Sequence, residues 1–206
     1  MIEIIGSTRG WHCRVTGIRP YGEKTGHPRF LLVPVVLRAA SMKLDHLDLL
    51  VNNAVTVSPD CNKGFFDANL DYIARTVDVA AVGPMRVIKA FYGFLIKSEK
   101  TALIMNISSE AGSISKCYRT NMIDYGIAKA ALNMGTMNLY NVFKDDPDIN
   151  IFAIHPGWIR TDGREDNPAP LSSYDAAEIL RDLFSKRFED REGHRFITNE
   201  GIDYPF

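Results

Sequence analysis

The fold is decided by residues 101–143, which read TALIMNISSEAGSISKCYRTNMIDYGIAKAALNMGTMNLYNVF. The first seven residues, Thr101 to Ile107, form an apolar run that ends at two serines and predicts a buried strand. From Ile123 to Phe143, apolar residues recur at three- and four-residue intervals, which is the spacing of a helix. A strand, a polar loop and a long helix are therefore expected in this order.

The same alternation continues on both sides of this stretch. Strands are predicted at residues 2–5, 47–51, 149–154 and 195–198, and helices at 71–97, with a kink at Gly83-Pro84, and at 175–188. Repeated strand-then-helix order predicts an α/β, Rossmann-like, three-layer α/β/α fold with a mostly parallel sheet. The loops after Ile5, Val51, Ile107 and Ile154 are expected to gather at one edge of that sheet, where such folds bind ligands.

Composition indicates an ordinary globular protein, expected as a single domain over residues 1–206. The chain is 46% hydrophobic with a formal net charge of −1, and its basic residues are scattered, so no nucleic-acid partner is expected. Three cysteines without metal-ligand spacing and an N-terminus without a leader pattern predict no metal and a cytoplasmic location. The apolar stretch at 30–37 is too short to span a membrane, which takes about 20 residues.

Tyr125 and Lys129 carry the clearest chemical signal. Four residues apart on a helix, they share one face, and a nearby cation lowers the pKa of a phenol and makes proton transfer feasible. Ser108 and Ser109, at the end of the preceding strand, offer two hydroxyls, one of which could hydrogen-bond a substrate oxygen beside them. We predict Tyr125 and Lys129 as catalytic residues together with one of these serines; the alternatives are a solvated helix face and a serine-rich turn.

In order and spacing, these residues resemble the short-chain dehydrogenase/reductase family. The resemblance covers residues 47–206, and its final segments are most similar to C-factor-type and sniffer-type carbonyl reductases. Ser109, Tyr125 and Lys129 match the family's catalytic set. Further agreement lies in Asn52 to Val55, Val82 to Pro84, Ala128 to Asn133, His155 to Asp162 and Asp203 to Phe206.

The resemblance also implies a cofactor and partners. NADP(H) is expected, with Arg9 as a hint of a phosphate partner, while NAD(H) and no dinucleotide at all stay open. A small-molecule substrate is implied, as is a homodimer or homotetramer formed through the helices at 71–97 and 123–143. The implied cofactor-binding residues are Gly6, Arg9, Gly10, Asn53, Ala54, Tyr125, Lys129, Pro156, Gly157, Ile159 and Thr161.

Residues 1–46 depart from the family pattern. The family's Thr-Gly-x-x-x-Gly-x-Gly turn keeps Gly6 and Gly10 here, but Ile5 replaces its threonine and His12 its last glycine. Residues 11–28 predict a loop, and residues 6–46 are fewer than the roughly 65 to 70 that the family's elements need before the fourth strand. We therefore expect a truncated or irregular nucleotide-binding part at 1–46, lacking at least one strand and one helix, and a well-matched catalytic part at 47–206.

Two substitutions in the matched part also bear on function. Ala80 stands where relatives usually carry an asparagine of the proton relay, and Val55 replaces a glycine near the adenine ribose. The leading interpretation is an NAD(P)(H)-dependent oxidoreductase that reduces a carbonyl or oxidises an alcohol by the Ser-Tyr-Lys mechanism. Two alternatives remain open: non-redox chemistry such as isomerisation or cyclisation after loss of the cofactor, and a non-catalytic remnant that acts through its helices.

Overall fold

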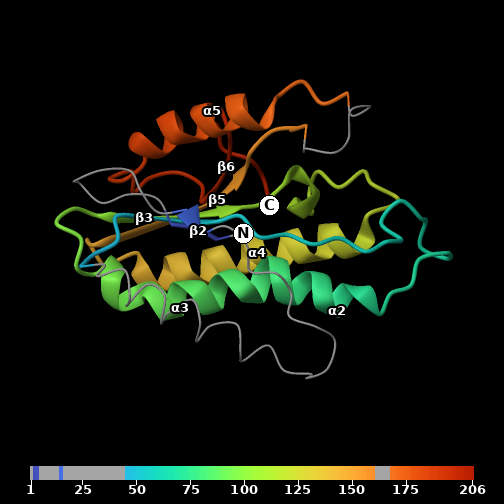
Figure 1. The fold of residues 1–206 in the computed structure, drawn as a ribbon, viewed down its shortest axis with the longest axis horizontal. Coiled ribbons are helices and arrows are strands. Elements are labelled where there is room, and N and C mark those ends of the chain that lie inside the picture. The colour runs from blue at the N-terminus through green and yellow to red at the C-terminus, as the bar shows by residue number, and fades with distance from the viewer. Residues whose placement is uncertain (1, 5–13, 16–44, 161–167) are drawn as a thin grey trace.

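The computed structural model describes residues 2–4, 14–15, 45–160 and 168–206. Its strands form one six-stranded sheet in the order β2-β1-β3-β4-β5-β6 (Figure 1). The strands are β1 (Ile2–Ile4), β2 (Arg14–Val15), β3 (Leu49–Asn52), β4 (Ala102–Ile107), β5 (Ile149–His155) and β6 (Phe196–Thr198). The helices are α2 (Tyr72–Val77), the π-helical turn η2 (Asp78–Val82), α3 (Gly83–Leu95), the 3₁₀ turn η3 (Glu110–Gly112), α4 (Ile123–Phe143) and α5 (Ser173–Ser185).

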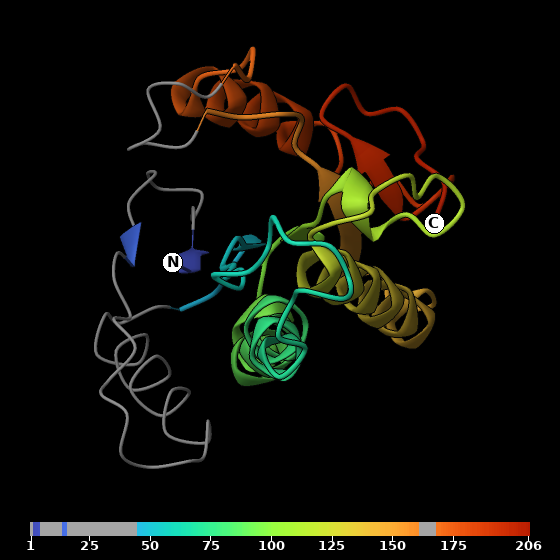
Figure 2. The ribbon, with the colours of Figure 1, turned by 90° about the vertical axis from the view of Figure 1, so that its right-hand side faces the viewer.

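The sheet separates two helical layers. Helix α5 lies on one face, and α2, α3 and α4 lie on the other (Figures 1 and 2). One apolar cluster packs the sheet against α3 and α4 through residues such as Leu50 and Ile104, and a second packs it against α5 through Val51 and Ile197. The predicted three-layer α/β/α fold is confirmed.

The predicted strand direction is right for four strands and wrong for the N-terminal one. Strands β3 to β6 are parallel, but β1 pairs antiparallel with both β3 and β2. The β-branched pattern at 2–4 favours pairing without fixing direction, because strand propensity is the same for both orientations. The carboxyl end of β1 therefore lies at the opposite edge from those of β3 to β6. Strand β2 also replaces part of the loop predicted at residues 11–28.

The helix predicted at 71–97 is interrupted earlier than expected. The π-helical turn η2 separates α2 from α3, and Pro84 lies in the first turn of α3, where its missing N–H costs no hydrogen bond. The 123–143 helix has the predicted bounds. Helix α5 begins before the predicted Asp175 because Ser172 caps it, accepting from Asp175 N at 3.0 Å. Within the described ranges, no helix has the length and apolar character that crossing a membrane requires.

Candidate active site

The loop that follows β4 carries Ser109 toward helix α4. Ser109 caps η3, and its hydroxyl accepts from Ala111 N at 3.2 Å. Gly112, at the end of η3, packs so closely on α4 that an added Cβ would lie 2.7 Å from the carbonyl carbon of Lys129. The absence of a side chain at Gly112 therefore lets the serine turn approach the helix face that carries the predicted tyrosine and lysine.

The structure brings Ser109, Tyr125 and Lys129 together at the carboxyl end of β4. The Ser109 side chain lies close enough to the Tyr125 phenol to influence its pKa. The Lys129 Nζ lies 5.6 Å from the centre of the Tyr125 ring and donates to Ile107 O at 2.6 Å. Ser109 and Lys129 are buried, with 6% and 3% of their surface exposed, so this small polar group is shielded from bulk water.

Burial governs the protonation of the pair. It raises the pKa of Tyr125, and the opposing effects of the Ser109 side chain and the Arg119 charge do not reverse the shift. Burial also lowers the pKa of Lys129 from 10.5 to about 8. The expectation that Lys129 lowers the Tyr125 pKa is therefore wrong for this structure. The ammonium is directed to the Ile107 carbonyl, and its own charge is disfavoured by burial.

Replacing Lys129 with methionine is expected to raise the free energy of unfolding at pH 7 by roughly 1 to 3 kcal/mol, the scale of the lysine's pKa shift. Because the folded chain binds the lysine proton less tightly than the unfolded chain, the cost of burying the ammonium is complete below pH 8. It shrinks as the pH rises toward 10.5. Urea unfolding of both proteins between pH 6 and pH 10 measures the difference, and a gain that does not shrink with pH would contradict this origin.

Buried polar side chains fasten the strands to α4 on both sides of Lys129. Asn106 accepts from Asn52 Nδ2 at 2.8 Å and donates to Thr136 Oγ1 at 2.9 Å. Ser108 donates to Asn133 Oδ1 at 2.6 Å, and Asn133 donates to Gly112 O at 3.1 Å. These bonds fix α4 against β3, β4 and η3, so the separation of the serine from the tyrosine and lysine is rigidly set.

Asp124 fixes the start of α4 in a similar way, through hydrogen bonds to two other segments. Its carboxylate is buried and accepts from Ser58 N at 2.7 Å and from Thr76 Oγ1 at 2.9 Å. The loop after β3 and helix α2 are thereby tied to the turn that carries Tyr125.

The described cofactor-binding candidates lie along the same edge of the sheet. Asn53 and Ala54 follow β3, while Pro156, Gly157 and Ile159 follow β5, and these strands end together because both are parallel to β4. Gly157 has φ of 87°, and a Cβ there would lie 2.9 Å from Leu171 and 3.1 Å from Asn199. Gly6, Arg9, Gly10 and Thr161 lie outside the described residues. Of the four loops expected to gather here, three do so, while β1 ends at the other edge.

Sequence reasoning missed the charged residues beside Ser109. Glu110, Arg119 and His155 form a cluster in which Glu110 Oε1 is paired with the Arg119 guanidinium and Glu110 Oε2 lies 3.8 Å from His155 Nδ1. Glu110 closely follows β4, and His155 ends the neighbouring parallel strand β5. Their positions after adjacent strands could have predicted that the two side chains lie close together. Arg119 offered none, because it lies in the loop between η3 and α4.

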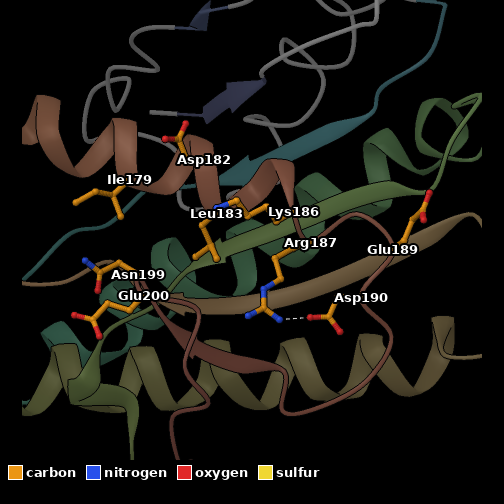
Figure 3. A pocket seen from close by; sticks show the side chains of 9 residues that line it. All are labelled: Ile179, Asp182, Leu183, Lys186, Arg187, Glu189, Asp190, Asn199 and Glu200. Atoms are coloured by element: carbon orange, nitrogen blue, oxygen red, sulfur yellow. Dashed lines mark hydrogen bonds and ion pairs between the residues drawn. The ribbon is translucent and has the colours of Figure 1, made fainter.

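A polar pocket lies apart from this group, where the end of α5 meets the loops on either side of β6 (Figure 3). Most of its lining is charged, and its Arg187 is paired with Asp190. It contains none of the predicted site residues, and its mixed charges give no single ligand chemistry. Its lining residues are Ile179, Asp182, Leu183, Lys186, Arg187, Glu189, Asp190, Asn199 and Glu200.

Comparisons with known proteins identify the family of the chain. The sequence pattern of the family described as short chain dehydrogenase matches residues 33–171. C-signal of Myxococcus xanthus is 30% identical over 163 residues, which span 78% of this chain and 93% of that protein. Short-chain dehydrogenase RED3 of Pyricularia oryzae is 28% identical over 176 residues, spanning 79% of this chain and 68% of that protein.

Solved structures give the same result. Carbonyl reductase Sniffer of D. melanogaster superposes with a TM-score of 0.74 at 25% identity, covering 85% of this chain and 73% of that one. A Burkholderia multivorans protein described as a putative short-chain dehydrogenase/reductase with bound NADP gives a TM-score of 0.73 at 25% identity, covering 85% and 74%. The resemblance inferred from the sequence motifs is confirmed. The chain belongs to the short-chain dehydrogenase family and is an oxidoreductase of the C-signal and Sniffer-like kind.

Proposed function

We propose that the protein is an NADP(H)-linked reductase of small carbonyl compounds that acts through Ser109, Tyr125 and Lys129. The observation that carries this proposal is the convergence of the three side chains: a half-buried phenol beside a buried serine, with a buried amine 5.6 Å from its ring. Similar proteins support the cofactor and the substrate class. They include an NADPH-bound carbonyl reductase from chicken fatty liver, with a TM-score of 0.71 at 25% identity.

The described edge of the sheet fits this cofactor, with Pro156, Gly157 and Ile159 toward its nicotinamide half and Asn53 and Ala54 toward its adenosine half. Asn53 is exposed, and Pro156 and Gly157 are half-buried, so a ligand can reach the main chain there. The positive φ of Gly157 turns the loop after β5 across the edge, and any side chain at that position would collide with Leu171 or Asn199. Asn53, Ala54, Pro156, Gly157 and Ile159 would hold the cofactor, which when bound supplies the hydride.

The protonation of the site favours the reducing direction. Because burial raises the pKa of Tyr125, the phenol keeps its proton at neutral pH and can give it to the oxygen of a carbonyl during reduction. Ser109 positions that oxygen next to the phenol. Lys129 lies one helical turn from Tyr125 and has a pKa of about 8, so it can release and take up a proton near neutral pH. It can therefore help to return a proton to Tyr125 after the phenol has given its own to the substrate.

Weakened cofactor binding with non-redox chemistry is the second candidate. Strand β1 runs antiparallel to β3, so its carboxyl end lies away from the edge that carries Ser109 and Gly157. Ala80 is fully buried in η2 and has no polar group with which to hold a water molecule. Both features favour an active site that keeps its acid but has lost part of its nucleotide-binding surface.

Fluorescence titration with NADPH and NADH separates the two candidates. We expect saturable NADPH binding, and we expect Gly157→Ala to weaken it at least tenfold because alanine is strained at a φ of 87° and the loop after β5 must shift to relieve that strain. Gly93→Ala is the matched control, since an added Cβ there meets nothing within 4 Å. No saturable binding up to about 1 mM, the upper end of ordinary KM values, would contradict the reductase and favour the non-redox candidate.

A further inference from the structure

Glu110 connects the predicted catalytic serine to the charged cluster. Its Oε2 accepts from Ser109 Oγ at 2.5 Å, and its Oε1 is paired with the Arg119 guanidinium. Only 20% of its side chain is exposed. A carboxylate therefore lies between the hydroxyl of Ser109 and the guanidinium of Arg119.

The hydrogen bonds of Ser109 determine which way its proton points. A serine hydroxyl has one proton to donate, and an ionised carboxylate can only accept, so the Ser109 proton belongs to the bond with Glu110. One lone pair accepts from Ala111 N. Ser109 therefore has no proton left to donate to an ionised Tyr125, whose phenol lies close enough for the serine to influence its pKa.

The surroundings keep Glu110 ionised. Burial alone would raise its pKa, but the bonds from Arg119 and Ser109 outweigh it and hold the pKa below its usual value. The charged and titratable groups that face it are Arg119 from the loop after η3, His155 from β5 and Tyr125 from α4. The Tyr204 ring, 6.0 Å from that of His155, contacts the cluster on its other side.

We propose that Glu110 is a positioning residue, which holds the Ser109 proton away from Tyr125 so that the serine cannot stabilise the phenolate and Tyr125 remains protonated. The negative charge of Glu110 also opposes ionisation of the phenol, whereas the positive charge of Arg119 favours it. The pair thus sets the protonation of Tyr125 through Ser109. The consequence for catalysis, a site biased toward carbonyl reduction, rests on the proposed function.

Two substitutions are expected to move the Tyr125 pKa in opposite directions. Glu110→Gln removes a negative charge and the obligate acceptor, so the pKa falls; Arg119→Met removes the positive charge, so it rises. The probe is a pH titration of protein labelled with ¹³C at the tyrosine Cζ, and Tyr125→Phe identifies the resonance. Glu178→Gln is the control, because this half-exposed glutamate on α5 is far from the group in sequence and pairs only with Arg181 at 3.8 Å among the described residues. An unmoved Tyr125 resonance in Glu110→Gln, or shifts of the same sign in both variants, would overturn the proposal.

Steady-state kinetics tests the route through Ser109. We expect Glu110→Gln to lower kcat by about ten- to a hundredfold with little change in KM, as for the loss of one charge-assisted hydrogen bond. In a Ser109→Ala background the same substitution should cost nothing further, since the group it positions is gone. Additive losses would contradict positioning through the serine. Opposite NMR shifts in a protein without reductase activity would uphold the positioning role and reject the proposed reaction.

Discussion

Tyr125→Phe is expected to lower kcat of NADPH-dependent carbonyl reduction by about 10²- to 10⁴-fold, the usual contribution of a positioned proton donor. Phenylalanine keeps the ring that lies near the Lys129 amine and removes only the phenol hydroxyl, the proposed proton donor. Hydride transfer would then leave an alkoxide without its acid.

The loss must appear in turnover and not in folding or cofactor binding. NADPH affinity should change by less than about threefold, and the unfolding free energy by about 1 kcal/mol, the net worth of one hydrogen bond. Tyr174→Phe is the matched control, since this tyrosine lies on α5 and is 71% exposed. Reductase activity within tenfold of the parent protein would remove Tyr125 from the role of proton donor.

The layered fold and the convergence of the three site residues follow from local sequence rules. Helical periodicity fixed the bounds of α4, and the four-residue spacing placed Tyr125 and Lys129 on one face. The serine reached them because parallel strands deliver their following loops to a single edge. These inferences needed no knowledge of which residues pack together in space.

The inferences that failed depended on tertiary contacts. The direction of β1 depends on how the chain returns to β3 and is not encoded in three residues. The Tyr125 pKa depends on burial, which outweighs the opposing effects of Ser109 and Arg119. Lys129 donates its hydrogen bond to the carbonyl of Ile107, a contact that its sequence position did not indicate. The hydrogen bond from Ser109 to Glu110 joins neighbours in the sequence. The charge state of Glu110, however, depends on Arg119 and His155, which belong to other parts of the chain.

Arg195 is the largest departure from what composition predicts, because arginine is rarely buried and this one is 1% exposed. Its guanidinium lies 4.7 Å from the Tyr140 ring centre and 4.4 Å from that of Phe152. It donates to Asn150 Oδ1 at 3.1 Å and to the main-chain carbonyls of Asp190, Glu192 and Gly193. The planar cation thus closes the loop between α5 and β6 onto the core.

Arg195→Met is therefore expected to lower the free energy of unfolding by about 3 to 5 kcal/mol, measured by urea denaturation. Methionine fills much of the space between Tyr140 and Phe152 but leaves the loop carbonyls and Asn150 without their buried donor. Arg181→Met is the control: Arg181 is 54% exposed, so its loss should cost no more than about 0.5 kcal/mol. A loss below about 1 kcal/mol for Arg195→Met would mean that the loop finds other donors.

The loop that Arg195 holds is also connected to the active site. Strand β6 follows this loop and pairs with β5 up to His155, which lies beside Glu110. Loosening the loop should therefore reduce the order of the Glu110 cluster and link the stability of β6 to the protonation of the active site.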